Sequence, residues 1–112
     1  NCLSEWFAFV PAKEYFDEPG DHADELETSV MMHYHPELVN LDEAGNGDYK
    51  KFTSQMLNEK VAWIPRNWQK VSQDTGIGNP KKASAEKGKK YAEAVVAKYA
   101  LLFEELVHKE LY

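Results

Sequence analysis

The segment from His22 to Ser29 holds the densest group of side chains that could do chemistry. It reads His-Ala-Asp-Glu-Leu-Glu-Thr-Ser, with one imidazole, three carboxylates and two hydroxyls in eight residues. An imidazole beside carboxylates can give or take a proton near neutral pH, and carboxylates also bind divalent metals. Acidic residues at a helix start can instead cap free N–H groups and offset the helix dipole. That alternative accounts for Asp24 and Glu25. It is weaker for Glu27 and does not require His22.

The geometry of a helix decides which of these side chains could act together. If the helix begins at His22, then Glu25 and Ser29 follow at i+3 and i+7 and share its face. Glu27 would then lie on another face. It would join His22 only if the first turn began later, or if His22 lay in the preceding loop.

Other patterns indicate ligand binding less strongly. His33 and His35 would point about 200° apart on a helix, so they could chelate a metal only from an extended chain. Otherwise they are two histidines at a helix C-terminus, where positive charge is favoured. The segment 42–48 has carboxylates and glycines without the ligand order of a calcium-binding EF-hand, which favours a solvated loop. The pair Gly76 and Gly78 lacks the third glycine of a dinucleotide-binding fingerprint.

Positive charge gathers near the start of the last predicted helix. Five lysines lie there: Lys81, Lys82, Lys87, Lys89 and Lys90. Because the helix dipole disfavours cations at this end, they either pair with acids elsewhere, bind an anion or form a solvated face.

The composition limits the class of protein. With 112 residues, of which 43% are hydrophobic, the chain predicts one globular domain at most. The net charge of −6 argues against nonspecific nucleic-acid binding, and we find no apolar run typical of a membrane span or signal peptide. The single Cys2 has no partner for an internal disulfide, which fits a cytoplasmic location. Because the chain begins at Asn1 and opens on an apolar run, we expect it to be part of a longer protein.

Two short apolar segments predict strands, and the segment between them predicts a helix. Residues 3–10 and 61–64 are each closed by a proline and are typical of short buried or extended strands. The helix is expected over about 22–34, with Asp21 as its N-cap and Pro36 ending it.

The last element is a long amphipathic helix, expected from Ser84 to about Leu111, with Ser84 or Asn79 as its cap. Its apolar stripe is too long for the few other elements to bury, so we expect it to pack on a sheet or on another subunit. The stripe consists of Ala92, Val95, Val96, Tyr99, Leu102, Phe103, Leu106 and Val107.

Two blocks of this sequence resemble the creatininase (creatinine amidohydrolase) family. The first is the octet at 22–29, followed by two methionines and then Pro-Glu-Leu-Val at 36–39. It is similar to the family signature H-A-G-E-x-E-T-S, an apolar pair and R-P-E-L-V. The second is Thr-Gly-Ile-Gly-Asn-Pro at 75–80, followed by Ala-Ser-Ala-Glu-Lys-Gly at 83–88, which resembles the family's glycine loop and helix start.

The resemblance implies an α/β fold, part of a three-layer α/β/α arrangement with a mainly parallel sheet and a long C-terminal helix. Residues 1–112 would form the C-terminal segment of a single domain, without the N-terminal part that holds most metal ligands. The implied partners are that N-terminal part, a small-molecule amide substrate and further copies of the protein, a hexamer by resemblance. Neither nucleic acid nor a membrane is implied.

The resemblance also implies an activity, the hydrolysis of C–N bonds in cyclic or linear amides with two divalent metal ions (Zn, Mn or Fe). His22 matches the catalytic histidine, and Glu25 and Glu27 match the acidic pair beside it. Glu27 would either ligate a metal or orient a metal ligand. This segment alone would be inactive.

Two departures from the family pattern bear on the substrate. Asp24 stands where the family often has glycine, and Glu18 stands where creatininase has a tryptophan over its substrate. We therefore expect an amide, formamide or lactam other than creatinine. The alternative is a structural or oligomerisation segment that retains the family motifs without catalysis.

Overall fold

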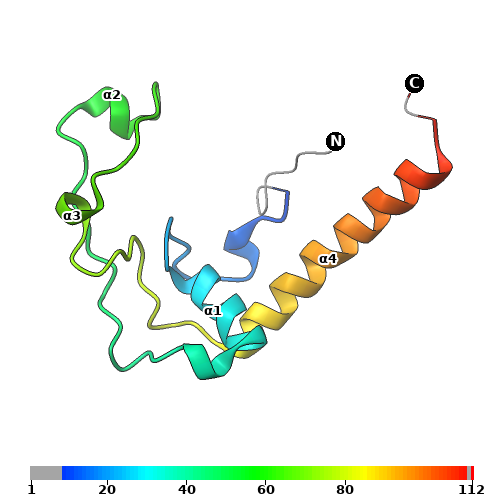
Figure 1. The fold of residues 1–112 in the computed structure, drawn as a ribbon, viewed down its shortest axis with the longest axis horizontal. Helices are drawn as coiled ribbons and strands as arrows, with labels where there is room; N and C mark the ends of the chain where they lie inside the picture. Colours follow the sequence, from blue (N-terminus) through cyan, green and yellow to red (C-terminus); the bar gives the residue numbers. More distant parts are fainter. Residues whose placement is uncertain (1–8, 111) are drawn as a thin grey trace.

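The computed structural model describes residues 9–110 and residue 112. Its described elements form an open, curved molecule in which α1 lies against the start of α4, while α2 and α3 project away on an arm (residues 49–72) (Figure 1). In chain order the elements are η1 (Ala12–Glu14), α1 (Glu25–Tyr34), η2 (Pro36–Leu38), α2 (Gln55–Asn58), α3 (Trp68–Val71) and α4 (Ala85–His108).

The helix α1 begins at Glu25, three residues later than the sequence predicted. Its N-cap is Asp24 rather than Asp21, because the Asp24 carboxylate accepts the backbone N–H three residues further on at 2.9 Å. His22 therefore lies in the loop before the helix. The predicted end at Tyr34 is confirmed, because the following proline disfavours helical geometry beyond it.

The helix α4 spans Ala85–His108, which corresponds to a length of about 36 Å. Ser84, one of the two predicted caps, accepts the backbone N–H of Lys87 at 3.2 Å. The long C-terminal helix is thus confirmed. Its buried residues all lie near its start, at Gly88, Tyr91 and the alanine that follows.

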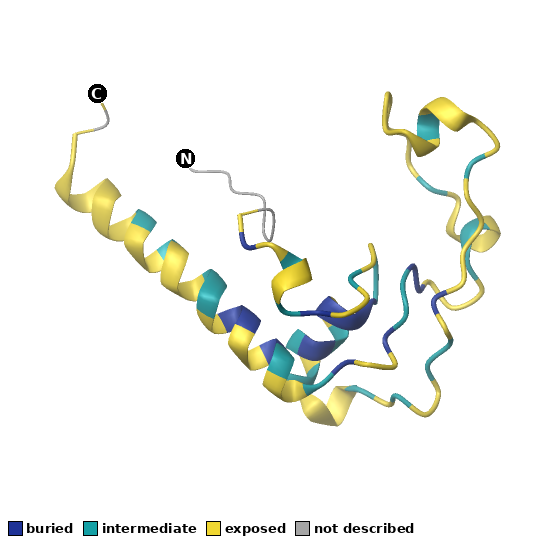
Figure 2. Cartoon of the chain, turned by 180° about the vertical axis from the view of Figure 1, so that it is seen from behind, coloured by how far each residue is buried: buried dark blue, intermediate teal, exposed yellow. Residues whose placement is uncertain are grey.

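The hydrophobic core lies where α1 and the loop before it meet the first turns of α4 (Figure 2). It consists of Val10, Phe16, Leu26 and Tyr91. The rings of Phe16 and Tyr91 meet edge to face with their centroids 5.2 Å apart, and the Tyr91 hydroxyl donates to the Val10 carbonyl at 3.2 Å. Burial raises the pKa of Tyr91. Each large apolar side chain buried here stabilises the fold by about 1.5–3 kcal/mol.

The two helices approach each other most closely at Gly88. A Cβ atom at this position would overlap the carbonyl oxygen of Ser29 on α1. Ser29 is fully buried, and its hydroxyl accepts the backbone N–H of Ser84 at 3.1 Å. Glycine is therefore required at position 88 by helix–helix distance, although it is a poor helix former.

The predicted three-layer arrangement with a parallel sheet is wrong for the part of the chain that the structure describes. Its only β-type pairings are two isolated antiparallel bridges, His22 with Ile77 and Tyr49 with Ser72. The predicted strand at 61–64 is irregular, with Trp63 83% exposed. Its backbone has no neighbouring strand to pair with, which a β-strand requires. Most of the other predicted strand, residues 3–8 of 3–10, lies outside the described residues.

The described residues do not all pack around this one core. The radius of gyration is 16.7 Å, larger than the roughly 13 Å expected for a compact domain of this length. No helix among them combines the length and the apolar character needed to cross a membrane. Much of the predicted apolar stripe on α4 is exposed beyond its first turns, including Val96, Phe103, Leu106 and Val107.

Substituting Gly88 by alanine tests the close approach of the helices. In an isolated helix this change would stabilise by up to about 1 kcal/mol, but here we expect a loss of about 1–3 kcal/mol because the methyl group would overlap the Ser29 backbone. Urea denaturation followed by circular dichroism measures it. Gly45→Ala is the control, since its Cβ would meet the end of the Asp74 side chain rather than backbone atoms. A Gly88→Ala variant as stable as the parent protein would contradict the packing.

Candidate active site

His22 is held in place by backbone groups of the segment 75–77. Its backbone N–H donates to the Ile77 carbonyl at 3.1 Å and its carbonyl accepts the Ile77 N–H at 2.8 Å. Its ring Nδ1 lies 2.9 Å from the Thr75 carbonyl oxygen. Because a carbonyl can only accept, Nδ1 carries the proton in this contact, which leaves Nε2 as the basic atom of the neutral ring. Thr75 has a positive φ of 67°, an uncommon backbone conformation for a residue with a side chain.

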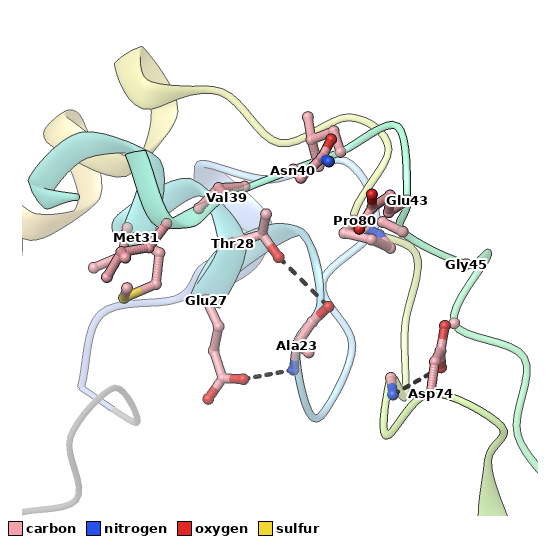
Figure 3. Close-up of a pocket in the computed structure, with 16 residues that line it drawn as sticks. Ala23, Glu27, Thr28, Met31, Val39, Asn40, Glu43, Gly45, Asp74 and Pro80 are labelled. Atoms are coloured by element: carbon pink, nitrogen blue, oxygen red, sulfur yellow. Dashed lines mark hydrogen bonds between the residues drawn. The ribbon is translucent and has the colours of Figure 1, made fainter. Parts of the chain in front are cut away.

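Glu27 lies in the first turn of α1, four residues after Ala23, and is exposed. Its Oε2 accepts the backbone N–H of Ala23 at 2.6 Å, and the Thr28 hydroxyl donates to the Ala23 carbonyl at 3.5 Å (Figure 3). These contacts hold Ala23 at a positive φ of 48°. The Glu27 carboxylate thereby braces the residue that follows the candidate catalytic histidine.

Glu25 points away from that side of α1 and is completely buried. Its Oε1 is 2.5 Å from the Lys87 ammonium, and its Oε2 accepts the backbone N–H of Glu18 at 2.6 Å. Ser29, one turn further along, is buried on the same side. Of the two arrangements that the sequence left open, the structure has the one in which His22 lies in the loop before the helix, so His22 does not share a helix face with Glu25 and Ser29.

The buried side chain of Asp24 holds the loop around His22 through hydrogen bonds. It is 4% exposed, and its Oδ2 accepts the backbone N–H of Gly20 at 2.5 Å while its Oδ1 caps α1. Gly78 packs against it with a φ of +122°, and a Cβ at Gly78 would lie 2.8 Å from the Asp24 Cβ. Asp24, which departs from the family pattern, therefore has a structural role.

A cavity of about 610 Å³ lies beside Glu27 (Figure 3). Among the described residues, three carboxylates line it, those of Glu27, Glu43 and Asp74, and no lysine or arginine does. Its other lining is mainly apolar or backbone and includes Met31, Leu38, Val39, Leu41 and Pro80. The sequence did not point to Asp74. Its position directly before the Thr-Gly-Ile-Gly loop was the available signal.

The described residues do not bring together three histidine, cysteine or acidic side chains that could hold a metal ion. His33 lies within the last turn of α1, and its ring contacts Tyr34, whereas His35 follows the helix and approaches Glu37 at 3.1 Å. The structure therefore does not join the two histidines in one site.

Four of the five lysines near the start of α4 pair with acids, one of the three possibilities that the sequence left open, whereas Lys81 donates to the Leu41 carbonyl at 3.3 Å. Lys87 is 2.8 Å from Asp17 and Lys82 is 2.7 Å from Glu18. These contacts lower the pKa of both carboxyls and raise the pKa of both lysines. They tie the loop before His22 to α4.

Comparison with known proteins identifies the family. The family model for creatininase, described as creatinine amidohydrolase, matches residues 3–103. The chain therefore belongs to the creatininase family. No curated protein matches it.

A crystal structure from Bacteroides fragilis NCTC 9343, of a protein provisionally named creatinine amidohydrolase, is 58% identical and superposes with a TM-score of 0.90. The match covers 97% of this chain and 44% of that one, so the chain spans less than half the length of its structural relative.

Substituting Lys87 by methionine tests the buried ion pair. The change leaves the Glu25 carboxylate buried without its cation, so we expect a clear fall in the denaturation midpoint at pH 7. Lys90→Met is the matched control, because Lys90 pairs with Glu86 at the surface and its loss should cost little.

The same variant should change the response to acid. Because Lys87 lowers the pKa of Asp17, this pair stabilises the fold above the ordinary carboxyl pKa of about 3.9, and the contribution is lost as the pH falls through the lowered value. Denaturation midpoints between pH 7 and pH 3 should therefore fall less steeply in Lys87→Met than in the parent protein. Parallel curves would contradict the assignment.

Proposed function

We propose that this chain is part of a metal-dependent amidohydrolase that cleaves a C–N bond in a small cyclic or linear amide. Its membership of the creatininase family supports the reaction class. The observation that carries the proposal is the orientation of His22, whose Nδ1 is held on a backbone carbonyl so that Nε2 is left for proton transfer.

His22 would act on the nitrogen of the scissile bond. An amide nitrogen is a poor leaving group until it is protonated, so a positioned acid lowers the barrier to cleavage. The Thr75 contact keeps the Nδ1 proton in place, and Nε2 can then take up a proton and deliver it. Glu27 keeps the adjoining peptide rigid and presents a carboxylate to the cavity.

The described residues do not by themselves fit a divalent metal site, which needs at least three protein ligands. Glu27 can supply one carboxylate, either to a metal or to another ligand. We propose that two divalent ions (Zn, Mn or Fe) are held chiefly by an N-terminal part of the same protein, and that the complete protein is a homo-oligomer in the cytoplasm.

The proposed substrate is an amide, formamide or lactam other than creatinine. Glu18 stands where creatininase has a tryptophan, and its carboxylate is engaged by Lys82 at 2.7 Å and by the Asn79 amide at 3.1 Å. A carboxylate bound in this way gives no aromatic face to a planar ring.

His22→Ala in the complete protein tests the proposed acid. We expect kcat to fall by about 10²-fold or more with unchanged metal content. A panel of creatinine, N-methylformamide and 2-pyrrolidone gives the rates, with the hydrolysis products creatine, methylamine and 4-aminobutanoate separated and quantified by chromatography. His108→Ala, at the far end of α4, is the control. Unchanged turnover in His22→Ala would remove the proposed role.

Glu27→Gln separates the charge of Glu27 from its contact with Ala23, because the amide oxygen of glutamine can still accept the Ala23 N–H. If Glu27 ligates a metal ion or orients another metal ligand, we expect the metal affinity of the complete protein to fall about 10- to 100-fold. Metal titration against a chelator measures it, with the surface variant Glu93→Gln as control. Full affinity in Glu27→Gln would exclude Glu27 from the metal site.

The exposed apolar side chains on the distal part of α4 favour a second candidate, a docking or oligomerisation segment without catalysis. The two functions differ in the complete protein. The first requires stoichiometric metal and amide turnover, whereas the second predicts assembly without either.

A further inference from the structure

The imidazole of His22 makes a second contact, with the indole of Trp68 at the start of α3. The ring centroids are 4.8 Å apart and the ring planes are tilted by 51°. The hydrogen bond to Thr75 restrains only one atom of the imidazole, so the ring could still tilt about that point. An indole against the ring restrains its plane, which a single hydrogen bond cannot do.

Trp68 is in turn held by Arg66, which lies on the same arm. The Arg66 guanidinium lies over the indole, 5.6 Å from its centroid, and forms an ion pair with Asp21. Asp21 directly precedes His22, so both ends of this series of contacts lie in the His22 loop: Asp21 contacts Arg66, Arg66 contacts Trp68, and Trp68 contacts His22. These contacts join the arm to the His22 loop across more than forty residues of sequence.

We infer that Trp68 is a positioning residue for His22, and that Arg66 holds Trp68 in place through its ion pair with Asp21. The inference rests on the proposed function, in which the direction of Nε2 decides the rate. Trp68 does not line the cavity beside Glu27, so it acts on the reaction through the histidine. Loss of the indole would let the imidazole leave the orientation that proton transfer requires.

The first test is the NMR spectrum of the complete protein with labelled histidine. His22→Gln identifies the His22 signal among the histidine signals of the complete protein. The ring current of the indole displaces the ring-proton signals of an imidazole this close to it, so Trp68→Leu should move the His22 signal toward its position in an exposed histidine. Trp68→Phe should retain part of the displacement, and Arg66→Gln should reduce it. The control is Trp63→Leu, because Trp63 lies on the same arm and is 83% exposed. A His22 signal that is unchanged in Trp68→Leu would overturn the inference.

The second test is kinetic and uses the three amides named above. Trp68→Leu should lower kcat about ten-fold with little change in KM, because orientation of the acid rather than substrate binding is lost. Trp68→Phe should recover most of the rate, and Trp63→Leu should match the parent protein. A change in KM alone, or an unchanged kcat despite a displaced His22 signal, would overturn the positioning role.

The two tests separate this inference from the proposed function. If the parent protein hydrolyses none of the amides and binds no metal, the proposed function fails. The NMR comparison would still decide whether Trp68 sets the orientation of the imidazole.

Discussion

The buried carboxylate of Glu25 is the constraint on which the arrangement of the described residues depends. A charge without water is costly unless it is paired and hydrogen-bonded, and Glu25 meets this requirement with the Lys87 ammonium and the Glu18 backbone N–H. Lys87 comes from α4 and also holds Asp17 in the loop before α1. The loop, α1 and α4 must therefore assemble together, and the loop that carries His22 takes its course from this assembly.

As a result, one side of α1 packs against α4 and the other side faces the cavity. Glu25 and Ser29 lie against α4, where Gly88 allows the backbones to approach closely, and they contribute to stability. Glu27 lies on the other side, beside the cavity. Of the acidic pair implied by the family resemblance, one member is thus engaged in the fold and the other is available to a ligand. The octet that contains both residues lies within residues 3–103, which the creatininase family model matches.

Local sequence signals predicted the helices better than they predicted the sheet. The end of α1 before Pro36 and the cap of α4 at Ser84 follow from backbone geometry within a few residues, so they could be read directly. The start of α1 was misplaced because two aspartates, Asp21 and Asp24, are both good caps, and only the contact of Asp24 with Gly20 distinguishes them. The sheet was wrong for the described residues because a strand needs a partner, and none of these residues forms a strand beside the apolar segment at 61–64.

The sequence by itself determined the family, the end of α1, the start of α4 and the choice of His22 and Glu27 as candidate site residues. It could not determine which carboxylate would be buried, nor that His22 would meet the Thr75 carbonyl and the Trp68 ring. Those contacts join residues about fifty positions apart, and they arise from backbone pairing of His22 with Ile77. Pairing between distant segments depends on how the whole chain closes, so only the tertiary structure decided how the histidine is oriented.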